Sequence, residues 1–212
     1  MKVLILGAGG HGQVVADILL RMVHAGQDVN PVGYLDDDPA LVGRSFLDLL
    51  VLGSCDTLSQ IDHEAVIVAI GDNAVRRRLF DRLEAQGTQF AVACHPSAVI
   101  APDVRIGPGT MVCAGVIVNT GTTVGSNVIL NTGCTVDHHN QVGDHVHLAP
   151  GVHLGGAVTI SEGSFIGIGS SVIPGRTIGP WSLVGVGSVV TKDIPAHVTA
   201  VGVPARVIGP AA

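Results

Sequence analysis

Aliphatic residues recur at every sixth position through the second half of the chain. From Cys94 to Val190 this column holds seventeen consecutive positions without an insertion, and all but the first are Ile, Leu or Val. The position four residues later is mostly small or β-branched, and glycine often follows the aliphatic residue, as in Ile106-Gly107. A fixed short period is the signature of a repeat architecture, and a six-residue period is typical of a parallel β-helix.

Each hexapeptide is therefore predicted to form one short strand and a tight bend, with the aliphatic side chain pointing toward the axis. No single coil can bury its own apolar column, so the coils must stack. With three hexapeptides in each triangular coil, as in known hexapeptide-repeat proteins, residues 94–195 make about five to six coils. Helical or transmembrane alternatives fit this region poorly because glycine and proline would break helices throughout.

The first 93 residues follow another pattern. A buried strand over 2–6 leads into Gly7-Ala8-Gly9-Gly10-His11-Gly12, and an amphipathic helix is predicted from Gln13 to about Ala25. A strand, a glycine loop and a helix are the setting in which backbone N–H groups bind a phosphate. The sequence thus predicts a nucleotide site in this half.

Two further strands support this interpretation. The strand over 32–35 ends in Asp36-Asp37-Asp38, where a carboxylate commonly reads a ribose or a base edge. The strand over 65–70 ends at Gly71, and Asn73 is expected to cap a helix that runs to Gln86. Some three strands make half of a dinucleotide fold, so this half suits a single nucleotide better than NAD.

Composition excludes several classes of function. The net charge is −6 with only two lysines and no basic patch, which argues against binding to nucleic acid. Mean hydropathy is +0.51, yet no apolar run approaches the roughly 20 residues of a membrane span. No signal peptide is recognisable, so a cytoplasmic location is expected. The four cysteines show no CxxC spacing and are interpreted as reduced, mostly buried thiols.

Histidines cluster in the repeat region. Five of the ten fall within sixteen residues: His138, His139, His145, His147 and His153. Neither His138 nor His147 occupies the inward aliphatic column, and Asn140 breaks the small-residue column in the same unit. Such irregularities mark functional positions in repeat proteins. The competing interpretations are solvated surface histidines and a zinc site; no two histidines lie one 18-residue coil apart, and no metal is expected.

The combination of motifs resembles one family. Gly-Ala-Gly-Gly-His-Gly, Tyr-Leu-Asp-Asp, Ala-Ile-Gly-Asp-Asn and the segment from Val136 to His147 are similar to the NeuD-type sugar acyltransferases, over essentially the whole chain. Closest in pattern are bacterial N-acetyltransferases of nucleotide-linked 4-amino-4,6-dideoxy sugars. The resemblance implies an α/β Rossmann-like half-domain (residues 1–93), an all-β left-handed parallel β-helix of hexapeptide repeats (94–195) and a C-terminal cap (196–212). It also implies a homotrimer whose active site lies between subunits.

The resemblance assigns roles to individual residues. It implies that His138 is the general base and that acetyl-CoA, the cosubstrate, contacts His147, Gly156, Ile168 and Gly185. It implies that the nucleotide sugar contacts Gly9, Gly10, His11, Asp36, Asp37 and Gly71. This sequence departs from the family at His139, where the family has a Glu or Asp that orients the base, so His139 is expected to be an orienting or auxiliary residue.

These expectations define a mechanism. A sugar amine that arrives as an ammonium must lose a proton before it attacks a thioester, and an imidazole is suited to accept it near neutral pH. The predicted function is acetyl-CoA-dependent N-acetylation of a nucleotide-linked 4-amino sugar in surface-glycan synthesis. The alternatives are a sugar O-acetyltransferase of the sialic acid type, a zinc hydratase and a non-catalytic nucleotide-sugar-binding β-helix. The sequence leaves open whether the nucleotide is UDP, GDP or dTDP, and which sugar stereochemistry is used.

Overall fold

The chain divides into two compact units in a computed structural model that describes residues 1–211. The first unit comprises residues 1–96 and the second begins at Ser97. In chain order the first unit contains β1 (Lys2–Leu6), α1 (Gly10–His24), β2 (Asn30–Leu35), β3 (Ser45–Phe46), β4 (Leu49–Gly53), the 3₁₀ helix η1 (Cys55–Gln60), β5 (Ala65–Val68), α2 (Asn73–Glu84) and β6 (Ala93–Cys94).

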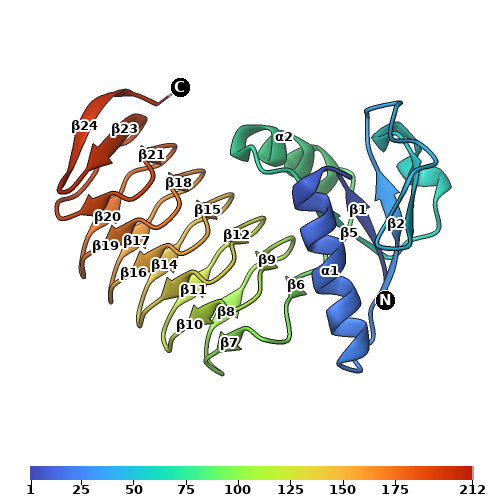
Figure 1. The fold of residues 1–212 in the computed structure, drawn as a ribbon, viewed down its shortest axis with the longest axis horizontal. Helices are drawn as coiled ribbons and strands as arrows, with labels where there is room; N and C mark the ends of the chain where they lie inside the picture. Colours follow the sequence, from blue (N-terminus) through green and yellow to red (C-terminus); the bar gives the residue numbers. More distant parts are fainter. Residues whose placement is uncertain (212) are drawn as a thin grey trace. The chain divides into compact units, whose positions relative to one another are not determined.

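A five-stranded sheet with the order β3-β4-β2-β1-β5 forms the centre of the first unit (Figure 1). Strand β1 runs parallel to both β2 and β5. Its residues Leu4 and Leu6 pack in one core with Phe80 and Leu83 of α2. Side chains alternate along a strand, so Val3 and Ile5 point to the opposite face, and α1 contacts β1 and β2. The Rossmann-like prediction is confirmed, although the expected number of strands was too low because β3 and β4 were missed.

Both helices begin at positions that differ slightly from the prediction. Helix α1 starts at Gly10 rather than Gln13, and the Gln13 N–H donates to the Gly9 carbonyl (3.1 Å). Helix α2 is capped by Asp72, whose Oδ1 accepts the Val75 N–H at 2.8 Å, so the expectation that Asn73 is the cap was wrong. A carboxylate at this position also interacts favourably with the helix dipole.

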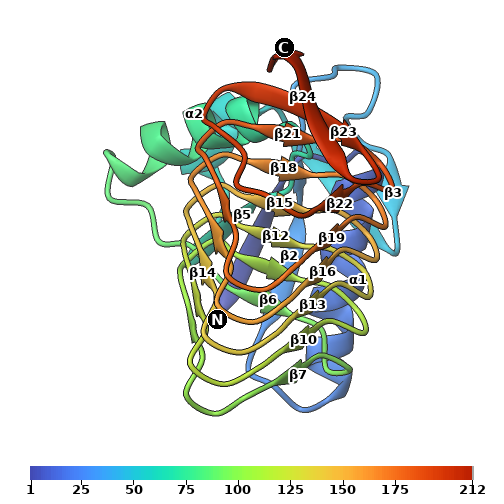
Figure 2. The same ribbon diagram turned by 90° about the vertical axis from the view of Figure 1, so that its left-hand side faces the viewer.

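The second unit is a prism built from three parallel sheets, and Figure 2 shows its coils stacked on one another. The first sheet contains β7 (Val99–Ile100), β10 (Ile117–Val118), β13 (Thr135–Val136), β16 (His153–Leu154), β19 (Ser171–Val172) and β22 (Val189–Val190). The second contains β8 (Arg105–Ile106), β11 (Thr123–Val124), β14 (Gln141–Val142), β17 (Thr159–Ile160) and β20 (Thr177–Ile178). The third includes β9 (Met111–Val112), β12 (Ile129–Leu130), β15 (His147–Leu148), β18 (Phe165–Ile166) and β21 (Leu183–Val184).

Strands one coil apart pair in strict register. Val118 pairs with Val136, and Val136 with Leu154, so each coil contains 18 residues. The aliphatic column is buried from Val112 to Val190, as the six-residue period predicts. The prism core is therefore a set of aliphatic stacks running along its axis.

Each coil turns its corners through residues with positive φ. Glycine occupies most of these positions because it adopts this conformation without steric cost. The non-glycine residues at the equivalent corners are Asn127, His139, His145, Ala157 and Trp181. Two members of the histidine cluster therefore occupy a backbone conformation that favours glycine.

The chain ends in a hairpin on the third sheet. Strand β23 (Val198–Gly202) pairs in parallel with β21, and β24 (Ala205–Pro210) pairs antiparallel with β23. Among residues 1–211, no helix has the length and apolar character needed to cross a membrane.

The glycine loop yields a stability test. A Cβ on Gly12 would lie 2.0 Å from the Gly7 carbonyl oxygen, whereas a Cβ on Gly10 would meet no atom within 4 Å. Gly12→Ala is expected to lower the free energy of unfolding by at least about 1–3 kcal/mol, because α1 must move away from β1. Gly10→Ala, the matched control, is expected to cause no loss. Equal stability of the two variants in urea unfolding would contradict this packing argument.

Candidate active site

The two central histidines face each other at the corner that follows β13. His138 Nδ1 and His139 Nδ1 lie 3.0 Å apart, and the rings meet edge to face with centroids 5.2 Å apart. Only one of the two nitrogens can carry the shared hydrogen. If His138 accepts a proton at Nε2, its Nδ1–H donates to His139, so His139 provides the acceptor that an acid would otherwise supply.

Each of these rings lies over a glycine on a neighbouring coil. The His138 ring covers Gly156, where a Cβ would be 2.4 Å from His138 Cε1. The His139 ring covers Gly121, where a Cβ would be 2.7 Å from His139 Cδ2. Each glycine lies at a corner one coil away from its histidine. Because neither glycine has a side chain, the imidazole ring has room to pack against its backbone.

Backbone and side-chain bonds fix the turn that carries His138. Asp137 Oδ1 accepts the His138 N–H (2.9 Å) and the Asn119 amide (3.0 Å). Asn140 is fully buried, its Nδ2 donates to the Asp137 carbonyl (2.5 Å) and its Oδ1 accepts the Val158 N–H (2.8 Å). The break in the small-residue column at Asn140 is therefore a hydrogen-bonded support for this turn.

The pKa of Asp137 is lowered, first by the Asn119 hydrogen bond and then by the His138 N–H and the nearby imidazole charge. Asp137 thus stays ionised beside the His138 ring.

The Gly156 backbone supplies a hydrogen-bond donor beside the His138 ring. Among residues 1–211 no acceptor is bonded to the Gly156 N–H, whereas its carbonyl accepts the Gly175 N–H at 2.9 Å. A backbone N–H without a protein acceptor next to a base can bind a developing oxyanion.

His147 is nearly buried on β15. Its Nε2 lies 3.2 Å from Asn131 Nδ2, and its ring meets Phe165 edge to face at 5.0 Å. His145 and His153 each form a hydrogen bond with a side chain one coil away. His145 Nδ1 lies 2.9 Å from Asn127 Nδ2, and His153 Nδ1 lies 2.8 Å from Thr135 Oγ1. The described part of the chain brings together no group of three His, Cys, Asp or Glu side chains able to hold a metal.

The two remaining residues that are predicted to contact acetyl-CoA, Ile168 and Gly185, lie on later coils than His138. The Ile168 side chain is 53% exposed, and Val186, one coil further on, is 73% exposed. The Gly185 N–H donates to the Ala200 carbonyl (2.8 Å), so its backbone is engaged within the prism. The structure does not bring Ile168 or Gly185 into contact with the histidine pair.

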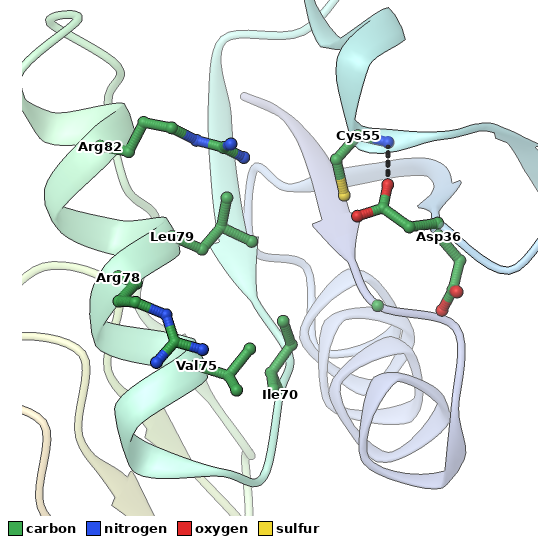
Figure 3. A pocket seen from close by; sticks show the side chains of 9 residues that line it. Asp36, Cys55, Ile70, Val75, Arg78, Leu79 and Arg82 are labelled. Carbon is green, nitrogen blue, oxygen red and sulfur yellow. Dashed lines mark hydrogen bonds between the residues drawn. The ribbon is translucent and has the colours of Figure 1, made fainter.

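The first unit contains a cavity of about 500 Å³ at the ends of β1, β2 and β5 (Figure 3). Its lining residues are Gly7, Asp36, Asp37, Cys55, Ile70, Val75, Arg78, Leu79 and Arg82. Of the predicted nucleotide residues, Asp36 and Asp37 line this cavity, whereas Gly9, Gly10, His11 and Gly71 do not. Cys55, Arg78, Leu79 and Arg82 were not predicted, although the run of arginines at 76–78 was a visible signal.

The two acids hold the backbone around the cavity. Asp36 accepts the Ala8 N–H at Oδ2 (2.7 Å) and the Asp38 N–H at Oδ1 (2.9 Å), which ties the glycine loop to the end of β2. Asp37 Oδ1 accepts the Cys55 N–H at 2.8 Å. Burial, followed by Asp37, raises the pKa of the Cys55 thiol to about 12, so this thiol is not a nucleophile near neutral pH.

His11 is not a cation at neutral pH. Burial, and secondarily the charge of Arg76, lowers its pKa to about 4. Arg76 is itself fully buried, and its Nη1 donates to the carbonyl oxygens of Ile70 (3.1 Å) and Gly71 (3.4 Å). His11 therefore offers a neutral ring near the glycine loop rather than a charge for a phosphate.

Comparison with known proteins identifies the family. The PglD N-terminal domain model matches residues 2–83. A perosamine N-acetyltransferase from Caulobacter crescentus, solved as a His-to-Asn mutant with CoA and GDP-perosamine, is 39% identical with a TM-score of 0.90, covering 99% of this chain and 97% of that one. The chain belongs to the NeuD-type family of sugar acyltransferases.

Other members agree with this assignment. The acetyltransferase domain of PglB from Neisseria gonorrhoeae, solved with acetyl coenzyme A, is 34% identical with a TM-score of 0.89 and 98% coverage of both chains. UDP-N-acetylbacillosamine N-acetyltransferase of Bacillus subtilis (strain 168) is 38% identical over 112 residues, which are 52% of this chain and about half (50%) of that curated relative. The predicted fold class, acyltransferase class and acetyl-CoA cosubstrate of this NeuD-type chain are confirmed.

The Gly156 contact yields a test of the histidine site. In Gly156→Ala the new methyl group displaces the His138 ring while the backbone N–H is kept, so kcat/KM is expected to fall at least about 100-fold. Ala157→Gly is the matched control, because it relieves a positive φ of 56° next door, and it should stay within about twofold of wild type. Acetyl-transfer rates that are equal in the two variants would show that the ring position is unimportant.

Proposed function

We propose that this protein is an acetyl-CoA-dependent N-acetyltransferase that acts on the 4-amino group of a nucleotide-linked 4-amino-4,6-dideoxy sugar in surface-glycan synthesis. The observation that carries the proposal is His138, which is paired with His139 and whose ring lies over Gly156, a residue whose N–H has no acceptor among residues 1–211. Sugar N-acetyltransferase relatives named for UDP- and GDP-linked sugars support the substrate class.

In the proposed reaction His138 Nε2 takes a proton from the bound sugar ammonium, and the freed amine nitrogen attacks the thioester carbonyl carbon. The second proton that the nitrogen loses goes to the departing thiolate. The carbonyl oxygen becomes an oxyanion, for which the Gly156 N–H is the donor. The C–S bond then breaks, and the CoA thiolate leaves and takes up a proton. His139 Nδ1 accepts the His138 Nδ1–H throughout, which holds the imidazole in the tautomer with Nε2 free.

A direct attack is favoured over an acyl-cysteine intermediate. Burial raises the pKa values of Cys113 and Cys134 to about 12, so neither thiol ionises appreciably near neutral pH. Most of the remaining acceleration then comes from holding the amine and the thioester together.

The remaining residues bind the two substrates. We assign His147 to the thioester end of acetyl-CoA and Ile168 and Gly185 to its arm, with the exposed Ile168 and Val186 side chains offering an apolar surface. The active site is proposed to lie between neighbouring prisms of a homotrimer in the cytoplasm, and residues 196–212 to act as the cap of the 94–195 prism.

In the nucleotide-sugar-binding half, residues 1–93, four further residues are assigned to contacts with the nucleotide sugar around the glycine loop: Gly9, Gly10, His11 and Gly71. Asp36 acts by fixing that loop, and Asp37 lines the cavity. The cavity favours this reaction over O-acetylation of a free sugar, which would have no use for a nucleotide pocket.

The test is release of the CoA thiol from acetyl-CoA in the presence of UDP-, GDP- and dTDP-linked 4-amino-4,6-dideoxy sugars. One member should turn over rapidly. His138→Asn should lower kcat by about 100-fold or more, and His139→Asn by about tenfold, because general acid–base catalysis contributes on this scale. His24→Asn, on the exposed surface of α1, is the control and should match wild type.

Two results would contradict the proposal. Full turnover in His138→Asn would show that this residue is not the base. Turnover of a hydroxyl acceptor, with none for any nucleotide-linked amine, would show that the protein is an O-acetyltransferase.

A further inference from the structure

The arginines of α2 fall into two groups. Arg76 is buried against the carbonyl oxygens that end β5, and Arg77 forms an ion pair with Asp81 (3.2 Å). Arg78 and Arg82, one helical turn apart, both line the 500 Å³ cavity. Within residues 1–211 neither of these two forms a hydrogen bond or an ion pair. The guanidinium groups of Arg78 and Arg82 are therefore available to contact a bound molecule.

These arginines lie at different levels of the cavity. Figure 3 shows Arg82 extending toward Cys55, while Arg78 lies nearer to Val75 and Ile70. The charge of Arg82 acts on the Cys55 thiol, which agrees with this placement. Cys55 in turn holds Asp37 through its N–H. One end of the cavity thus combines a carboxylate acceptor with an arginine donor.

The space between these groups suits a flat aromatic ring. Ile70, Val75 and Leu79 provide an apolar side, and a second cavity of about 380 Å³ adjoins the first at Cys55 and Arg82. A two-ring base has room to extend in this direction. The hydrogen-bonding groups of the Asp37 carboxylate and the Arg82 guanidinium then determine which base can bind.

Among the common bases, guanine matches this pair. Its N1–H and amino group are adjacent donors for a carboxylate, and its O6 and N7 are adjacent acceptors for an arginine fork. Uracil and thymine offer one N–H between two carbonyl oxygens, which a carboxylate repels, and adenine presents an acceptor at N1. A buried polar group that is left unpaired costs binding energy, so the mismatch itself discriminates.

We propose that this cavity selects a guanine nucleotide, with Asp37 reading N1–H and the 2-amino group and Arg82 reading O6 and N7. Arg78, at the other level, contacts the ribose-phosphate part and is indifferent to the base. The inference rests on the proposed nucleotide-sugar function and specifies its substrate as a GDP-linked sugar.

Calorimetric titration of the full chain with GDP, inosine diphosphate, ADP and UDP tests the assignment without acetyl transfer. GDP should bind at least about tenfold more tightly than UDP or ADP. Inosine diphosphate, which lacks only the 2-amino group, should bind more weakly than GDP. Asp37→Asn keeps an oxygen for the Cys55 N–H and should abolish the difference between GDP and inosine diphosphate.

The arginine variants separate the two roles. Arg82→Ala should weaken GDP at least about tenfold and UDP little, so that the preference disappears. Arg78→Ala should weaken all four nucleotides by similar factors. Arg77→Ala, on the same helix, is the control and should leave every affinity unchanged; thermal unfolding checks that each variant folds.

The outcomes distinguish the inference from the proposed function. Equal binding of GDP and UDP, or an unchanged preference in Arg82→Ala, overturns the guanine assignment but leaves a nucleotide-sugar enzyme. A preference for UDP overturns it in the same way. Failure of every nucleotide to bind would overturn both.

Discussion

Hydrogen bonds between strands one coil apart determine where the side chains of the prism lie. The 18-residue register places Gly156 against His138 and Gly121 against His139, and it does so through backbone pairing that spans the whole second unit. A residue inserted between these positions would shift each imidazole away from its glycine. The geometry of the proposed catalytic site is thus a consequence of the repeat rather than of a separate loop.

The sequence predicts this part of the structure well because the repeat has a fixed period. The aliphatic column gives the strands, and counting one coil forward from His138 gives Gly156. The six-residue period does not predict the side-chain torsion angles of a residue at a corner. The Nδ1–Nδ1 contact between His138 and His139, and the bond from Asn140 to the Asp137 carbonyl, depend on torsions that only the folded chain defines.

The first unit is harder to predict. Strands β3 and β4 and the short helix η1 have no clear alternation, since β3 contains only two residues and η1 has no buried residue. Arg78 and Arg82 were visible on a predicted helix, yet their helix spacing does not say which elements they face. Their common cavity with Asp37 arises from tertiary packing. Both carboxylate oxygens of Asp36, which is predicted to contact the nucleotide, accept backbone N–H groups.

The central claim is that His138 removes the proton from the attacking amine. The most direct measurement is the pH dependence of kcat for wild type and His138→Asn with the accepted amino sugar. Below the pKa of the bound amine the variant can use only free amine, so its rate should fall about tenfold per pH unit, while wild type holds its rate until the imidazole is protonated. The ratio of the two rates should therefore grow as the pH is lowered through this range. Parallel profiles, with a constant ratio, would contradict the claim and show that His138 only helps to position the substrate.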